Sequence, residues 1–284
     1  MIRVQKGRLR ASVAVLALLL ALGGCANAPS SSVAKSETTG SIAAAPQKPR
    51  TEAEWRREAE TLAERYRAEP ENADIAIAYS QALRGMGQRS QAVAVLEQAS
   101  IHNPQNQTLL GHYGRALADV GNYTQALDVL ARAHTPDQPD WRILSVQGAV
   151  LDQMGRNEEA RNHYFSALRI APNEPSVLSN LGLSYALSKD LTKAEETLRL
   201  AAAQPSAEPK VRQNLALVVG LQGRFAEAET IARGDLSPDE AAANVAYLRQ
   251  MLLQQKDWKK PPARRPATPV AQQPVKTKAL TLLD

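Results

Sequence analysis

Alanine recurs along this chain at an interval of 34 residues, and this spacing limits the possible fold more than any other feature of the sequence. The recurring alanines are Ala92, Ala126, Ala160, Ala194 and Ala228. Two further columns keep the interval, a large residue at Leu96, Leu130, Tyr164 and Leu198, and a small one at Ser80, Gly114, Gly148, Gly182 and Ala216. A period of this length indicates a repeat architecture, in which each unit is one supersecondary element stacked on its neighbours.

These columns resemble the tetratricopeptide repeat, a pair of helices, A and B, that cross closely where small residues allow it. The units then span residues 73–106, 107–140, 141–174, 175–208 and 209–236 and begin at Ala73, Gln107, Trp141, Pro175 and Pro209. Aromatic residues make up only 4% of the chain, which favours helices over a β-sandwich. We therefore predict an all-α fold, a right-handed alpha-solenoid of about five repeats and about twelve helices.

The turn between helices A and B is predicted to hold a residue in the left-handed conformation, which glycine adopts without steric cost. Glycine occupies this position at Gly87, Gly121, Gly155 and Gly223, and Lys189 is the exception. Capping helices are predicted at both ends. Thr51 and Glu54 have capping-box spacing before a helix within 51–72, and Ser237 and Glu240 have it before a helix over 237–255. Arg212 and Asp235 interrupt the apolar columns of the last unit, as is usual for a terminal repeat.

Residues 1–24 have the pattern of a secretory signal peptide, with four basic residues before the apolar segment from Ala11 to Leu22. As a helix that segment would be about 18 Å long, too short for a hydrocarbon core of about 30 Å. Leu22, Gly23, Gly24 and Cys25 look like a lipobox, the signal that directs a diacylglycerol to the cysteine of bacterial lipoproteins. Cys25 is the chain's only cysteine, and the alternative is an ordinary signal peptide with an incidental cysteine.

The resemblance implies a lipid on Cys25 as the only covalent addition, with no other cofactor and no metal. Ala26 replaces the aspartate that retains enteric-type lipoproteins at the inner membrane, so we expect an outer-membrane protein that faces the periplasm of a Gram-negative bacterium. Residues 25–50 are rich in Ser, Ala and Pro and are predicted to be a flexible tether of about 25–30 Å. The basic, Pro-rich segment 256–284 is also predicted to be disordered.

The net charge of +5 does not describe the part of the chain predicted to fold. The excess of lysine and arginine lies in the signal segment, the tether and the tail, whereas residues 51–255 contain more acidic than basic residues. An acidic body argues against a nucleic-acid surface. The four histidines are scattered without metal-ligand spacing, and no phosphate loop or nucleophile elbow occurs. We therefore expect neither catalysis nor a small-molecule substrate. The alternative is an enzyme with an unrecognised active site.

Tetratricopeptide families bind partners on the concave wall formed by the A helices, at positions 2, 5, 6, 9, 12 and 13 of each unit. Carried over to this sequence, the first three units offer Asp74, Gln81, Arg84, Arg115, Asp119, Arg142 and Asp152. The last two offer Asn180, Leu183, Leu187, Lys210, Gln213, Asn214, Leu217 and Leu221. One half of the groove is thus predicted to be charged and the other apolar. The lysine-and-asparagine carboxylate clamp of chaperone-docking members is not reproduced in this sequence. Only Lys210 could be part of such a clamp.

Asn180 and Asn214 occupy the same position one repeat apart. An amide side chain can both donate to and accept from an extended peptide backbone, so these residues are candidates for peptide binding. The alternative is that asparagine is simply common at this position of the repeat.

The C-terminal repeat and the helix after it, with Asn244 to Arg249 reading Asn-Val-Ala-Tyr-Leu-Arg, resemble the TadD family, the tetratricopeptide lipoproteins of the tight-adherence (Flp-type) pilus system. The resemblance implies a pilotin-like role, in which the groove holds a secretin or another assembly protein. A general periplasmic scaffold for outer-membrane protein assembly or cell-wall synthesis is the alternative.

The lipobox prediction is tested by Cys25→Ser. Two or three acyl chains hold a protein on a bilayer at about 0.8 kcal/mol per buried CH₂, so their loss should move the protein from the membrane pellet to the soluble periplasmic fraction and abolish labelling by palmitate. Ala26→Ser, which keeps the thiol, is the control. A serine variant that still sediments with the outer membrane would contradict the prediction.

Overall fold

The computed structural model describes residues 51–258, and in this range the chain forms twelve α-helices and no strand. The A helices of the five repeats are α3 (Ala73–Gly85), α5 (Gln107–Asp119), α7 (Trp141–Gln153), α9 (Pro175–Leu187) and α11 (Pro209–Leu221). The B helices are α4 (Arg89–His102), α6 (Tyr123–Ala131), α8 (Asn157–Ile170), α10 (Leu191–Ala202) and α12 (Phe225–Ala232). Helices α2 (Glu52–Ala68) and α13 (Pro238–Trp258) flank them. The predicted all-α repeat array is confirmed, whereas the signal segment, Cys25, the tether and the tail from residue 259 lie outside the described residues.

The close crossing of helices A and B in each repeat is set by a small residue at position 8 of helix A. A Cβ added to Gly148 would lie 2.6 Å from the ring of Tyr164, and one added to Gly182 would lie 2.6 Å from Leu198. Real Cβ atoms do not approach this closely, so these positions need glycine for the helices to pack as they do. The recurring alanines from Ala92 to Ala228 are fully buried in the same crossings.

Position 15 ends the A helix in the left-handed region in four of the repeats, where glycine stands with φ between 74° and 87°. Lys189 occupies this position in the fourth repeat and has a φ of 66°. Its side chain is exposed, and its backbone N–H donates to the carbonyl of Ala186 at 2.9 Å, so the turn keeps its shape without glycine. A lysine in this conformation carries a steric cost that the other repeats avoid.

Both flanking helices begin with a capping box and cover an end of the array. The Thr51 N–H donates to the Glu54 carboxylate at 2.6 Å, and the Ser237 N–H donates to the Glu240 carboxylate at 3.0 Å. At the N-terminal end, the Trp55 ring lies 2.5 Å from where a Cβ of Gly85 would be. At the other end, Leu248 of α13 lies 2.5 Å from where a Cβ of Gly220 would be. Helix α13 runs to Trp258, the last described residue, past the predicted boundary at residue 255.

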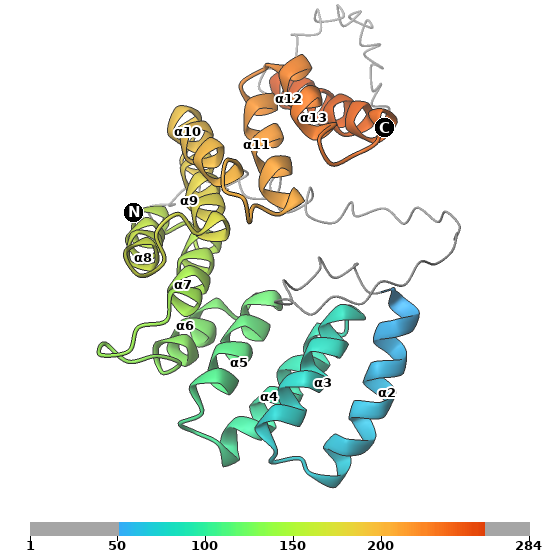
Figure 1. Ribbon diagram of the computed structural model, residues 1–284, viewed down its shortest axis with the longest axis vertical. Coiled ribbons are helices and arrows are strands. Elements are labelled where there is room, and N and C mark those ends of the chain that lie inside the picture. Colours follow the sequence, from blue (N-terminus) through green and yellow to red (C-terminus); the bar gives the residue numbers. More distant parts are fainter. Residues whose placement is uncertain (1–50, 259–284) are drawn as a thin grey trace, which may run out of the picture.

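The array curves, with the A helices on the inner side. Each A helix contacts the next A helix directly, whereas no two consecutive B helices among residues 51–258 contact each other. In Figure 1 the helices follow an arc from α2 to α13, with α3, α5, α7, α9 and α11 lining its hollow side. No helix in this range is long and apolar enough to span a bilayer. The A helices therefore form the concave surface on which the predicted groove residues stand.

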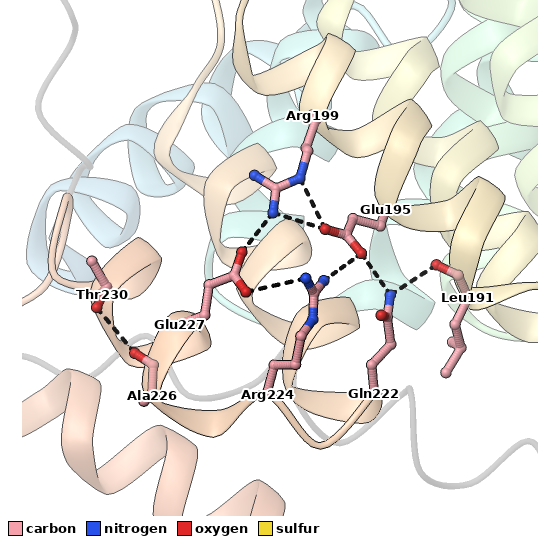
Figure 2. Close-up of polar contacts among 8 residues, drawn as sticks. All are labelled: Leu191, Glu195, Arg199, Gln222, Arg224, Ala226, Glu227 and Thr230. Atoms are coloured by element: carbon pink, nitrogen blue, oxygen red, sulfur yellow. Dashed lines mark hydrogen bonds and ion pairs between the residues drawn. The ribbon is translucent and has the colours of Figure 1, made fainter.

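A network of charged side chains fixes the fourth repeat to the fifth (Figure 2). The carboxylate of Glu195 accepts from Arg199 Nε at 2.9 Å, from Gln222 Nε2 at 2.9 Å and from Arg224. The carboxylate of Glu227 binds the same two arginines, at 2.6 Å and 3.1 Å. The hydrogen bonds from Arg224, and then from Arg199 and Gln222, lower the pKa of Glu195 to about 2 despite its partial burial.

The left-handed turn at Lys189 gives a first stability prediction. Lys189→Gly removes the steric cost at this position but adds entropy to the unfolded chain, so the free energy of unfolding should rise by about 0.5–1 kcal/mol in urea titrations. The reciprocal change, Gly155→Lys, should lower it by a similar amount. Equal effects of the same sign at the two positions would contradict this account.

The network of Figure 2 gives a second. Glu195→Gln should lower the free energy of unfolding at pH 7 by about 1 kcal/mol, since a charged acceptor is lost. Because the folded pKa lies below the unfolded value of about 4.3, this contribution is present above that value and is lost as the pH falls toward 2. The difference between wild type and variant should therefore shrink between pH 5 and pH 2. The exposed neighbour Glu196→Gln is the control and should show no such dependence.

Candidate functional site

The charged half of the concave surface is built on α3, α5 and α7. Arg84 of α3 forms an ion pair with Asp119 of α5 at 2.6 Å, so these two residues bind each other across the joint between the first two repeats. Arg115 lies on the same wall, where neighbouring groups around its guanidinium, through loss of water and the charge of Arg84, lower its pKa although the residue as a whole reaches the surface. The same two arginines help to lower the pKa of His112, whose main cause is loss of water around the ring. Arg115 is therefore a cation that this half can present to a ligand.

Arg142, the third predicted arginine of the groove, is exposed at the first turn of α7. Its guanidinium lies 4.3 Å from the centre of the Trp141 ring, in a cation–π contact with its neighbour in sequence. This contact holds the side chain at the end of the helix.

The apolar half consists of four leucines, two on each of two adjacent helices. Leu183 and Leu187 lie one turn apart on α9, and Leu217 and Leu221 occupy the same positions on α11. Helices α9 and α11 contact each other directly, so the four side chains form a two-by-two array that we call the leucine ladder. All four are half-buried, and none belongs to the buried core clusters of residues 51–258. The ladder is thus a partly exposed apolar strip that lies outside these core clusters.

The two asparagines predicted for peptide binding point toward the preceding repeat. Asn180 Nδ2 donates to Ser145 Oγ at 3.1 Å, and Asn214 Nδ2 donates to Ser179 Oγ at 2.9 Å. Asn180 is half-buried, whereas Asn214 is only 8% exposed. Each pair is a rung between consecutive A helices, so one donor of each amide stabilises the packing that positions the leucines. Lys210 is exposed at the start of α11.

Asp152 was expected on the concave wall, but its side chain is buried and only 8% exposed. Its carboxylate accepts hydrogen bonds from Tyr164 at 2.9 Å, Ser184 at 2.8 Å and Asn157 at 2.7 Å. Burial raises the pKa of Asp152, and the three hydrogen bonds oppose that rise. The sequence signal for this cluster was the tyrosine that replaces leucine at position 24 of the third repeat, since its hydroxyl needs a partner when buried.

The two residues that interrupt the columns of the last repeat bind each other. Arg212 donates two hydrogen bonds to the carboxylate of Asp235, at 2.7 Å and 2.5 Å, and a third to the carbonyl of Ala207 at 3.1 Å. Asp235 is 8% exposed as a side chain. In the fifth repeat an ion pair therefore links α11 to the segment after α12, at positions where the other repeats have apolar residues. Helix α11, which carries Leu217 and Leu221, is held in place by this pair.

The remaining surface offers little enclosure for a small molecule. One open hollow of about 320 Å³ lies between α2, α3 and α4 and is lined by Tyr66, Tyr79 and Val95. Another, of about 490 Å³, lies at the turn between α7 and α8. The part of the chain that the structure describes holds no group of three His, Cys, Asp or Glu side chains able to bind a metal ion. The concave wall, with its charged half and its apolar half, is therefore the candidate binding surface of residues 51–258.

Two family models match the sequence over this array. The model for the anaphase-promoting complex, cyclosome, subunit 3 matches residues 56–133, and a tetratricopeptide-repeat model matches residues 146–209. No curated protein matches the chain.

Solved structures share the fold at low sequence identity. PilW, described as a widely conserved type IV pilus biogenesis factor, is 14% identical with a TM-score of 0.59, over 68% of this chain and 91% of that one. A thermophilic TPR protein of Thermus thermophilus, TTC0263, is 23% identical with a TM-score of 0.55, over 64% and 100%. Cut9 in its hetero-tetramer with Hcn1 is 17% identical with a TM-score of 0.58, over 72% and 40%. The period, the helix pairs and these matches together identify residues 51–258 as a tetratricopeptide-repeat array.

Proposed function

We propose that this protein is a non-catalytic, lipid-anchored adaptor of the outer membrane, which binds an apolar segment of a pilus-assembly protein on its leucine ladder. The observation that carries the proposal is the ladder itself. Leu183, Leu187, Leu217 and Leu221 are half-buried on two helices that contact each other directly. Apolar side chains that reach the surface next to one another, rather than singly, are a feature of interaction sites.

The ladder has the geometry that an amphipathic helix or an extended chain can use. Leucines one turn apart on α9, repeated on α11, accept apolar side chains spaced by three or four residues along a partner helix. The Asn180–Ser145 and Asn214–Ser179 rungs and the network around Glu195 hold the supporting helices in place before a ligand arrives. Binding then costs little rearrangement of the groove, and each methylene that the partner buries contributes about 0.8 kcal/mol.

The assignment to pilus assembly comes from the resemblance of the C-terminal repeat and helix to the TadD family. In that family's role the protein is a pilotin-like factor for the secretin of Flp (Tad) pilus biogenesis. The lipid on Cys25 would supply the membrane address, and the segment between Cys25 and α2 would let the array stand away from the bilayer. The acidic balance of residues 51–255 favours a protein partner over nucleic acid. The fold likeness to PilW agrees with this role but does not carry it, since 14% identity reaches only the fold.

A photocrosslinking amino acid placed at Leu221 in living cells tests the proposal. Ultraviolet light should join the protein to the secretin, detected by antibodies against both partners. Combining the crosslinker with Leu183→Gln and Leu217→Gln should reduce the adduct about tenfold or more, as expected when central apolar contacts are lost. The same double variant should reduce secretin multimers in the outer membrane.

Leu200 provides the matched control, because this leucine is 60% exposed on the B helix α10, away from the concave wall. A crosslinker at residue 200, or Leu200→Gln, should leave capture and secretin multimers unchanged. Circular dichroism must show that the double variant is folded. Normal secretin multimers and surface pili with the double variant would refute the pilus role. An adduct with a cell-wall or outer-membrane assembly protein would support the general scaffold instead.

A further inference from the structure

The joints between consecutive repeats are not equally linked by polar side chains. Arg84 and Asp119 link the first repeat to the second. Asn180–Ser145, Ser184–Asp152 and Arg161–Ser188 link the third to the fourth, and the Glu195 network with Asn214–Ser179 links the fourth to the fifth. Between the second repeat and the third, the described residues form one side-chain hydrogen bond, the local cap that Asp140 gives the N–H of Arg142 at the start of α7. No such bond or ion pair within residues 51–258 joins a helix of the second repeat to a helix of the third.

The helix on one side of that joint is short. Helix α6 has 9 residues, whereas the B helices of the adjacent repeats, α4 and α8, have 14 each; α12, in the last repeat, is also short with 8. It ends at Ala131, and Pro136 and Pro139 in the connection to α7 exclude further helical turns. The second repeat therefore offers less helical surface to α7 than its neighbours offer to theirs.

Two buried polar atoms without a hydrogen-bond partner lie at the same joint, Nδ1 of His134 and Oε1 of Gln147, and residues 51–258 contain no others. His134 is in the connection after α6 and interacts electrostatically with His163 of α8, whose pKa it helps to lower after loss of water. Gln147 is 6% exposed at position 7 of its repeat. Position 7 faces the preceding element elsewhere, since Tyr79 stacks on Tyr66 of α2. Neither atom therefore contributes a hydrogen bond between protein groups to the joint.

The rung that links later A helices is missing here. In the third and fourth repeats, serine at position 5 accepts from asparagine at position 6 of the next repeat. At the second joint these positions hold Gly111 and Val146, which cannot form the bond. The tip of Ile143, its Cδ1 atom, lies 2.7 Å from where a Cβ of residue 111 would be, so an apolar contact replaces the rung. Apolar contacts are non-directional and tolerate sliding better than a hydrogen bond does.

We infer that the joint between the second and third repeats is a hinge, across which the array bends as two rigid parts. One part comprises α2 to α6 and carries Arg84 and Arg115. The other comprises α7 to α13 and carries the leucine ladder. Bending at this joint changes the distance between the charged and apolar halves of the concave surface, so the protein can fit partners of different length. This bending is a property of the array alone and does not depend on which partner it binds.

Spin labels at position 22, which is exposed in every repeat, measure this bending directly. The test uses cysteine pairs two repeats apart in a Cys25→Ser background: Ala94 with Asn162, Asp128 with Glu196, and Asn162 with Thr230. The first two pairs span the proposed hinge and the third does not. Pulsed electron paramagnetic resonance should give distance distributions roughly twice as wide for the first two pairs as for the third. Equal widths for all three pairs would overturn the hinge.

A locking variant gives a second readout. Gly111→Ser with Val146→Asn introduces the missing rung, and Ile143→Val removes the Cδ1 atom that would clash with the new serine. In this triple variant, the distributions of the two spanning pairs should narrow toward that of the third. Distributions that stay wide although the variant is folded would show that the missing rung does not cause the motion. A variant that fails to fold leaves the comparison of the three pairs in the otherwise native chain as the deciding measurement.

Discussion

The approach of helix A to helix B at one small residue per repeat is the contact on which the rest of the structure depends. At Gly148 and Gly182 the facing side chain occupies the space that a Cβ would need. The short distance between the two helix axes at this residue sets the angle at which helices A and B cross. That angle in turn sets the rotation from one repeat to the next. Because the A helices also contact each other and the B helices do not, the same crossing produces the concave wall. A missing methyl group in the second, third and fourth repeats, and a small side chain in the first and fifth, therefore shape the whole array.

The concave wall has a charged half and an apolar half because the side chains that link successive repeats differ along the array. In the later repeats, polar atoms are used in rungs and networks along the joints, which leaves leucines at the outer turns of α9 and α11 facing the hollow side. In the first two repeats the charges themselves face the hollow side, and Arg84 and Asp119 neutralise each other there. The joint between these parts has neither device. The repeats that carry the leucine ladder are thus also the repeats that polar side chains link most extensively.

The sequence predicted the helices correctly wherever the same packing contact recurs at the same position of each repeat. The five A helices begin at Ala73, Gln107, Trp141, Pro175 and Pro209, and both capping boxes form. A regular interval makes such positions readable because the same contact recurs at each. Nearly the whole helical framework of residues 51–258 could be predicted in this way.

What could not be predicted was how the exceptions pair. Tyr164 with Asp152, and Arg212 with Asp235, each depart from a column in one repeat and are compensated by another departure some distance along the chain. The columns show that something differs but not which two differences meet. For the same reason Asp152 was expected on the concave wall, and the amides of Asn180 and Asn214 were not expected to bind serines. Such pairings depend on three-dimensional neighbours that the repeat interval does not specify.

The glycines at the two ends of the array have one more consequence. Trp55 fills the space beside Gly85, and Leu248 fills the space beside Gly220, so the chain itself occupies both faces on which another copy could stack. An uncovered end of a helical-repeat array is a template for head-to-tail growth into fibres. The bulky side chains at both ends of residues 51–258 therefore occupy the surface through which each internal repeat stacks on the next.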